Sequence, residues 1–204
     1  MEHIVYVVDD DDAVRQSVLG LLESADLDAM GFSSAEAFLQ HRFEDLPSCV
    51  ILDMQMPAIS GFDVADALKD SGRDIPIIFL TGHGTIPMSV RAIKGGAYEF
   101  LTKPVLPDEL INSVADALAL AEKSAVLSQE KLLLTTRYHS LTPREKELMQ
   151  HILRGLLNKQ IASEMEISEI TAKVHKRRVL DKMVVRSVPE LIRAAEKLGI
   201  LHDN

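Results

Sequence analysis

Reactive side chains follow four apolar runs of the sequence, each at the point where the run ends. The runs and the groups that follow them are His3–Val8 with Asp9–Asp12, Cys49–Leu52 with Asp53, Ile77–Leu80 with Thr81, and Tyr98–Thr102 with Lys103. Such runs are typical of buried strands, and an open parallel sheet keeps its chemistry at the carboxyl ends of its strands. The sequence therefore predicts that carboxylates, a hydroxyl and an amine converge at one edge of a sheet.

Asp53 is the candidate nucleophile, because a carboxylate can attack a phosphoryl group to give an aspartyl phosphate. The protein must then position the reacting groups, neutralise the crowded oxygens with a divalent cation, and donate hydrogen bonds to the transferred group. Asp9 or Asp10 together with Asp53 would bind Mg²⁺, which prefers oxygen ligands. Thr81 and Lys103 would donate hydrogen bonds to the phosphoryl oxygens.

The four consecutive aspartates have a second explanation. Aspartate is favoured at helix starts, where its carboxylate accepts hydrogen bonds from unpaired backbone N–H groups. We favour this explanation for Asp11 and Asp12, and the metal site for Asp9 and Asp10. His83 lies in the loop after the third apolar run, and we assign it no chemical role.

Five pairs of strand and helix are predicted before residue 120. The strands lie near residues 3–8, 29–32, 49–53, 77–81 and 97–102, and the helices begin at Ala13, at a capping-box pattern in Ser33–Glu36, at Gly61, near Ile86 and at Pro107. Alternation of this kind builds a parallel sheet with helices on both faces. The expected fold class is α/β, a doubly wound (βα)5 sheet of the flavodoxin-like type.

The fifth helix has no predicted end before residue 140, since residues 108–140 contain neither Gly nor Pro. One stripe recurs along it at spacings of three and four, at Ile111, Val114, Leu118, Ala121, Ala125, Ser128, Leu132 and Thr135. We expect a semi-rigid helical connector. The alternative is a frayed linker over residues 128–140, because isolated helices need tertiary support.

Residues 141–204 are predicted to form an all-α module of four short helices. The helices begin after the cap Thr142, at Lys159, at Glu169 after the cap Ser168, and after Ser187. The third of them carries the basic set Lys173, Lys176, Arg177, Arg178 and Lys182 and the apolar set Ile170, Val174, Val179, Leu180 and Met183. We expect the apolar set to face the core and the basic set to face solvent or a polyanion. A short helix, a turn and a basic helix form a helix-turn-helix, whose second helix enters the DNA major groove.

Length and charge agree with two domains that have different partners. The chain has 204 residues and a net charge of −9; residues 1–120 hold 7 Lys and Arg against 20 Asp and Glu, and residues 141–204 hold 12 against 9. The single cysteine, Cys49, excludes an intrachain disulfide, and no apolar stretch approaches the roughly 18 residues of a membrane span. We expect a soluble, cytoplasmic protein without a membrane partner.

Residues 1–120 resemble the receiver domain of bacterial two-component response regulators. The resemblance rests on Val7–Asp11, Leu52–Gly61, Leu80–Gly84 and Phe100–Pro104, in this order. It implies that Asp53 takes a phosphoryl group from the phosphohistidine of a sensor histidine kinase. It also implies that Mg²⁺, or Mn²⁺ in its place, binds Asp10, Asp53 and the backbone carbonyl of Gln55, while Asp9 acts through a water. Thr81 and Phe100 would be the switch pair, and Lys103 would complete the site.

Residues 138–200 resemble the LuxR/NarL-type DNA-binding domain through Leu141–Glu145, Gly155–Ala162 and Ile167–His175. The whole chain is similar to regulators of the FixJ type, a group that includes the styrene-catabolism regulators. The resemblance implies that the phosphorylated protein binds double-stranded promoter DNA as a homodimer and contacts RNA polymerase. It also implies that the helix from Pro189 to Leu198 pairs the DNA-binding domains of the two subunits. The DNA contacts that it implies are Lys173 and Arg177, with Lys159, Thr171, His175, Lys176 and Arg178 as further candidates.

We therefore expect a receiver domain over residues 1–120, a helical linker over 121–140 and a DNA-binding domain over 141–204. The expected function is phosphorylation-gated transcription regulation, with no catalysis beyond self-catalysed phosphoryl acceptance and slow autodephosphorylation. A Mg²⁺-dependent phosphatase is the rival, but such enzymes usually carry a second acid two residues after the nucleophile, and Gln55 stands there. A constitutive DNA-binding protein with a vestigial receiver is less well supported, because the acidic set is intact.

Overall fold

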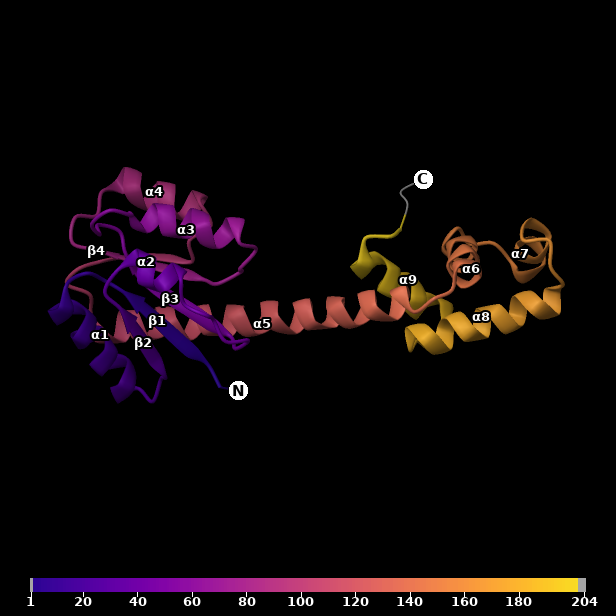
Figure 1. The fold of residues 1–204 in the computed structure, drawn as a ribbon, viewed down its shortest axis with the longest axis horizontal. Coiled ribbons are helices and arrows are strands. Elements are labelled where there is room, and N and C mark those ends of the chain that lie inside the picture. The colour runs from indigo at the N-terminus through magenta and orange to yellow at the C-terminus, as the bar shows by residue number, and fades with distance from the viewer. Residues whose placement is uncertain (1, 202–204) are drawn as a thin grey trace. The chain divides into compact units, whose positions relative to one another are not determined.

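The computed structural model describes residues 2–201. The chain divides into two compact units, Met1–Ala125 and Val126–Asn204. The first unit contains a sheet flanked by helices, and the elements described in the second unit are all helices (Figure 1). The helix α5, Pro107–His139, contributes its first part to one unit and its last part to the other.

The first unit contains one parallel sheet of five strands in the order β2-β1-β3-β4-β5. The strands are β1 Ile4–Val8, β2 Ala29–Phe32, β3 Ser48–Asp53, β4 Ile77–Thr81 and β5 Glu99–Thr102, and the helices between them are α1 Asp12–Ser24, α2 Ala35–Leu39, α3 Gly61–Asp70 and α4 Ile86–Lys94. The predicted doubly wound (βα)5 fold is confirmed. The strand order reverses beside β1, which places a topological switch point between β1 and β3.

Residues of each central strand alternate between two hydrophobic clusters, one on each face of the sheet. On one face Val5, Ile51 and Leu80 pack against residues of α1 and α5. On the other face Tyr6 and Phe79 pack against residues of α2, α3 and α4. Burial on both faces explains why these strands read as continuous apolar runs in the sequence.

The helix starts follow the predicted caps, with one exception. Asp11 is the N-cap of α1, and its side chain accepts hydrogen bonds from the backbone N–H groups of Ala13 and Val14. The capping box that we expected within Ser33–Glu36 is wrong. Ser34 is the N-cap of α2, and the residue three positions later is Ala37, whose methyl group cannot bond back to the cap.

The helix α5 is continuous over 33 residues, but the single stripe predicted along it is wrong. Ala121 is buried in the first unit, and Leu134 belongs to the core of the second unit. Between them the stripe position Ser128 is exposed, and Leu132 is 66% exposed. Each unit buries its own side of the helix, so the buried positions do not follow one phase along its length.

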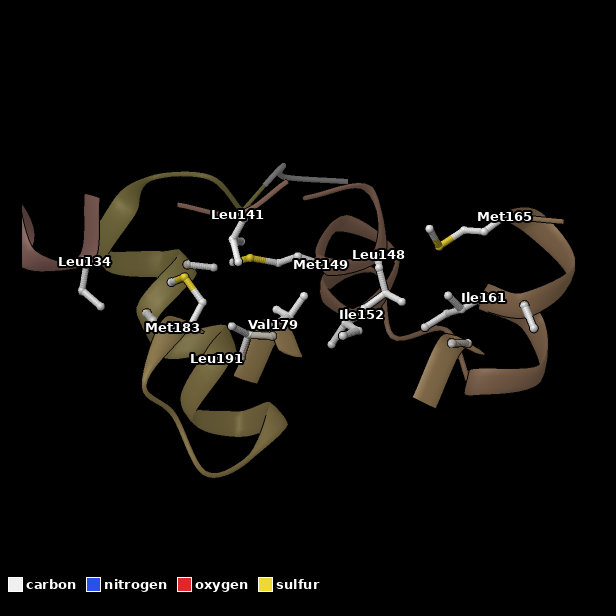
Figure 2. Packing of buried hydrophobic residues seen from close by; sticks show 14 residues of the cluster. Leu134, Leu141, Leu148, Met149, Ile152, Ile161, Met165, Val179, Met183 and Leu191 are labelled. Carbon is white, nitrogen blue, oxygen red and sulfur yellow. The ribbon is translucent and has the colours of Figure 1, made fainter. Parts of the chain in front are cut away.

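The second unit consists of the last part of α5 with α6 Pro143–Leu153, α7 Asn158–Glu164, α8 Glu169–Met183 and α9 Val188–Leu198. Its core gathers buried side chains from all of these helices (Figure 2), among them Leu134, Leu148, Ile161, Val179 and Leu191. The predicted caps Thr142, Ser168 and Ser187 each accept a hydrogen bond from the backbone N–H three residues later.

An ion pair between Lys182 and the buried Glu145 joins α8 to α6. Glu145 is 3% exposed, and its Oε2 accepts hydrogen bonds from the Thr142 backbone N–H at 2.8 Å and from Lys182 Nζ at 2.6 Å. Burial alone would raise the pKa of Glu145, but the hydrogen bonds from Lys182 and Thr142 outweigh it and lower that pKa from 4.5. Lys182 therefore holds α8 against α6 through Glu145, whereas we predicted that it belongs to the basic set that faces solvent or a polyanion.

We expect Glu145→Gln to lower the free energy of unfolding of the second unit by about 2 kcal/mol at pH 7, because Lys182 loses a charged partner. A carboxyl group with a lowered pKa contributes stability above its unfolded pKa of 4.5 and loses it as the pH falls through the folded value. The difference between variant and wild type should therefore shrink below about pH 4.5. Urea titration read by hydrogen exchange of peptides from residues 141–198 measures it.

The matched control is Glu147→Gln, since Glu147 forms an exposed ion pair with Arg144 on the same helix. We expect a change below about 0.5 kcal/mol for this variant. An equal loss of stability in the two variants, or a loss in Glu145→Gln that does not depend on pH, would contradict the assignment.

Candidate functional site

Three carboxylates meet at the carboxyl edge of the sheet. Asp9 follows β1, Asp53 ends β3, and the pairing of Val8 with Leu52 places these two strand ends side by side. One carboxylate oxygen from each of Asp9, Asp10 and Asp53 lies within 4.8 Å of the others. Asp9 and Asp53 are buried, at 3% and 7% exposure, whereas Asp10 is exposed.

Lys103 brings a positive charge to this group from the end of β5. Its Nζ lies 2.6 Å from Asp9 Oδ2 and 3.1 Å from Asp53 Oδ2. Burial by itself would lower the pKa of the Lys103 ammonium, but its hydrogen bonds to Asp9 and Asp53 outweigh burial and raise that pKa. The ammonium is therefore firmly charged and bridges two carboxylates that otherwise repel each other.

The remaining oxygens of the two buried carboxylates accept backbone hydrogen bonds. Asp9 Oδ1 accepts from the N–H of Asp11 at 2.9 Å, and Asp53 Oδ1 accepts from the N–H of Gln55 at 3.1 Å. Arg15 donates to the backbone carbonyl of Asp9 at 2.7 Å and forms an ion pair with Asp12. These contacts hold the two acidic loops in place before any ligand binds.

Gly61 allows the start of α3 to lie against the end of β3. A Cβ atom at this position would lie 2.6 Å from the backbone oxygen of Asp53 and 2.9 Å from the Cα of Met54. Both contacts are with backbone, which cannot swing away as a side chain can. The position of the Asp53 main chain therefore depends on a residue without a side chain at position 61.

Thr81 and Phe100 lie on the neighbouring strands β4 and β5. Thr81 is fully buried, and its Oγ1 accepts a hydrogen bond from the backbone N–H of His83 at 3.3 Å. The ring of Phe100 is half-buried, and a Cβ atom on Gly84 would lie 3.0 Å from it. The loop after β4 thus contacts both residues, through the hydroxyl of Thr81 and the ring of Phe100.

The acidic group fits a hard divalent cation. Its donors are carboxylate oxygens, which Mg²⁺ prefers, and the exposed Asp10 leaves the group open to solvent. Asp9 has both of its side-chain oxygens in hydrogen bonds, to Lys103 and to Asp11. Met54 and Met56 are buried in the core beside the site and pack there with the side chains around them.

Most of the predicted DNA contacts lie on one helix, α8. Lys173, Arg177 and Arg178 are exposed, and His175 and Lys176 are half-buried. Lys173 forms an ion pair with Glu169 at 3.5 Å, and Arg177 donates to Asp181 at 3.0 Å. The other two candidates are Lys159, exposed near the start of α7, and Thr171, half-buried with its Oγ1 2.8 Å from the Ser168 hydroxyl.

Two apolar residues of α8 do not lie where we expected them. Ile170 is 75% exposed and Val174 is 45% exposed, although both were predicted to face the core. The core side of the helix is formed by Ala172, Val179 and Met183. The prediction failed because basic and apolar residues alternate so closely here that composition could not decide which way each side chain faces.

Comparison with known proteins gives two family matches, which together cover both units. Residues 5–115 match the response regulator receiver domain, and residues 139–195 match the bacterial regulatory proteins of the luxR family. The chain belongs to the response regulators. It unites a receiver domain with a LuxR-type DNA-binding domain, and relatives of this type are transcriptional regulators of two-component systems.

The similarity extends over nearly the whole chain. The response regulator protein TodT of Pseudomonas putida is 44% identical over 96% of this chain and 86% of its own length. The transcriptional regulatory protein FixJ of Bradyrhizobium diazoefficiens is 38% identical over 98% of this chain and 97% of its own. Among solved structures, the response regulator StyR has a TM-score of 0.87 and 41% identity, covering 97% of this chain and all of that one.

Three residues that support the sites of this response regulator were not singled out in the sequence. Arg15 had a signal, since it stands three residues after Asp12 on a predicted helix, where an ion pair can form. Gly61 was noted only as a helix start, and its contact with the Asp53 backbone joins segments eight residues apart. Glu145 was noted only within the segment Leu141–Glu145, and its partner Lys182 is 37 residues away.

We expect Gly61→Ala to destabilise the receiver domain by about 1–3 kcal/mol, because the new methyl group forces the backbone at Asp53 and Met54 to move. The matched control is Gly20→Ala in α1, where a Cβ atom meets nothing within 4 Å. In a helix this substitution should stabilise by about 0.5–1 kcal/mol. Urea unfolding of the two variants, read by hydrogen exchange of peptides from residues 48–70, checks the opposite signs.

Proposed function

We propose that Asp53 is the phosphoryl acceptor of this response regulator and that a sensor histidine kinase is the donor. The observation that supports the proposal is the bridge from Lys103 Nζ to both Asp9 and Asp53 at the edge of the sheet. In the reaction, an oxygen of Asp53 bonds to phosphorus as the P–N bond of the phosphohistidine breaks. The imidazole nitrogen leaves with the bonding electron pair.

We assign the divalent cation, Mg²⁺ or Mn²⁺, to Asp10, Asp53 and the backbone carbonyl of Gln55, with Asp9 acting through a water. When bound, the cation supplies positive charge that neutralises the carboxylate and phosphoryl oxygens. Lys103 supplies a second positive charge that is held in place before the reaction. Such fixed charges stabilise the transferring group without having to reorganise at the moment of reaction.

We assign the conformational response to Thr81 and Phe100. The Thr81 hydroxyl would turn from its contact with the His83 N–H toward a phosphoryl oxygen, and the loop after β4 would move with it. Since Gly84 of that loop lies against the Phe100 ring, movement of the loop frees space into which the ring can follow. Phosphorylation shifts the equilibrium because only one of the two states makes the new hydrogen bond.

We propose that this shift promotes a homodimer that binds promoter DNA through α8 and contacts RNA polymerase in the cytoplasm. In functional terms the receiver comprises residues 1–120, the linker 121–140 and the DNA-binding domain 141–204. No described helix is long and apolar enough to span a membrane. The exposed cations of α8 support DNA as the partner, because lysine and arginine gain affinity by releasing counterions from phosphates.

The alternative is a phosphatase that turns over small phosphomonoesters through the same aspartyl phosphate. The observation against it is the position two residues after the nucleophile, where Gln55 provides no acid or base. We propose that dephosphorylation is only slow and self-catalysed. A phosphate-release assay with small phosphomonoesters separates the two functions, since steady turnover would establish the enzyme.

We expect acetyl phosphate and Mg²⁺ to add one phosphoryl group to the wild-type chain, visible as a labile adduct by intact mass. Asp53→Ala should remove the adduct, because it removes the acceptor oxygen. The matched control is Asp28→Ala, at an exposed position after α1, which should keep the adduct. An adduct that persists in Asp53→Ala would refute the assignment. If phosphorylation then leaves oligomeric state and DNA affinity unchanged, the gating part of the proposal fails alone.

We expect Lys173→Ala and Arg177→Ala each to weaken DNA binding. The salt dependence of the binding constant should show whether each side chain contacts a phosphate or a base. Loss of a phosphate contact weakens binding to all sequences and reduces the salt slope by about one, whereas loss of a base contact costs about 1–3 kcal/mol on the specific site only. Arg144→Ala, an exposed charge on α6, is the control. Binding by both variants that equals wild type at every salt concentration would exclude α8 as the DNA-binding helix.

A further inference from the structure

The start of α8 exposes an isoleucine that does not pack in the core formed by the described residues. Ile170 is the second residue of the helix and is 75% exposed. The adjacent core positions are filled by Ile167 and Ala172, which pack in the core of the DNA-binding domain. A β-branched side chain is also a weaker helix former than the alternatives available to an exposed position. Neither packing nor helix propensity accounts for Ile170.

Ile170 shares its helix face with two cations. Residues three, four and seven positions apart lie on one side of a helix, which groups Ile170 with Lys173, Val174 and Arg177. Lys173 and Arg177 are 61% and 79% exposed along their side chains. The face therefore combines positive charge with two apolar side chains.

We propose that Ile170 reads the C5-methyl group of a thymine in the DNA major groove and so determines part of the target sequence. This inference rests on the proposed binding of DNA by α8. The N-terminal residues of a recognition helix contact base edges, and the thymine methyl group is the apolar feature that the major groove presents. Ile170 stands at that end of α8, where an apolar side chain has no other partner in a polar groove.

The charges around Ile170 favour DNA over an apolar protein surface as its partner. Lys173, Lys176, Arg177 and Arg178 follow within eight residues, and a protein surface would have to desolvate or pair most of them. Glu169 and Asp181 offset two of these charges through ion pairs within the helix. A polyanion satisfies the cations at its phosphates while its groove accepts the isoleucine.

The geometry of the helix sets the spacing of the thymines. Ile170 and Val174 are one turn apart, which is about 6 Å along the helix axis. Base pairs repeat every 3.4 Å or so along DNA, so methyl groups contacted by these two residues lie at most about two base pairs apart. Val174 therefore provides a matched control, because it should respond to a different thymine of the same half-site.

The experiment first selects a target from a random double-stranded DNA library with the full-length protein, treated with acetyl phosphate and Mg²⁺. Each thymine of the selected site is then replaced singly by uracil, which removes only the C5-methyl group. Binding is measured for wild type, Ile170→Ala and Val174→Ala, with circular dichroism to verify that the variants fold. At the thymine that Ile170 contacts, we expect about a four-fold loss of affinity for wild type, since the contact buries roughly one methyl group.

In Ile170→Ala the loss at that one thymine should disappear, while the losses at other thymines and the affinity for unrelated DNA remain. Val174→Ala should keep the loss at the Ile170 thymine. If Ile170→Ala shows the same uracil losses as wild type at every position, the inference is wrong while DNA binding by α8 stands. If wild-type protein selects no sequence, the proposed function fails and this inference fails with it.

Discussion

The receiver domain depends on holding three carboxylates together at one edge of its sheet. Asp9, Asp10 and Asp53 each place an oxygen within 4.8 Å of the others, and two like charges 4 Å apart near a protein surface repel by roughly 4 kcal/mol. Lys103 offsets part of this repulsion by contacting two of them. A site with surplus negative charge around one ammonium attracts a divalent cation. The surplus that makes the site costly to fold also makes it chemically suited to a divalent cation.

The elements around this site are arranged to meet that constraint. Parallel strands bring the ends of β1, β3 and β5 to the same edge, so residues far apart in sequence become neighbours. Gly61 permits the start of α3 to approach the Asp53 backbone, and Asp11 fixes the start of α1 beside Asp9. The two acidic loops are thereby fixed by main-chain contacts.

The DNA-binding domain contains the opposite solution to the same physical problem. Glu145 is also a buried carboxylate, but it accepts hydrogen bonds from a single lysine, Lys182, and from the backbone N–H of the cap Thr142. No surplus negative charge remains at this pair. The pair therefore stabilises the fold and does not attract a cation. The two sites differ in how many negative charges share one cation. In Asp9 and Asp53 two carboxylates share Lys103, and in Glu145 one carboxylate has Lys182 to itself.

The sequence by itself determined the order and type of the elements, because apolar runs, caps and glycines act over a few residues. Asp53 at the end of β3 and Thr142 as a cap follow from such local rules. Only the tertiary structure decided which side each residue faces and which distant charge it meets. Ile170 faces solvent, Lys182 meets Glu145, and Leu134 is buried where Leu132 was expected. These outcomes depend on packing between segments. The periodicity of one helix does not tell where the neighbouring segments lie.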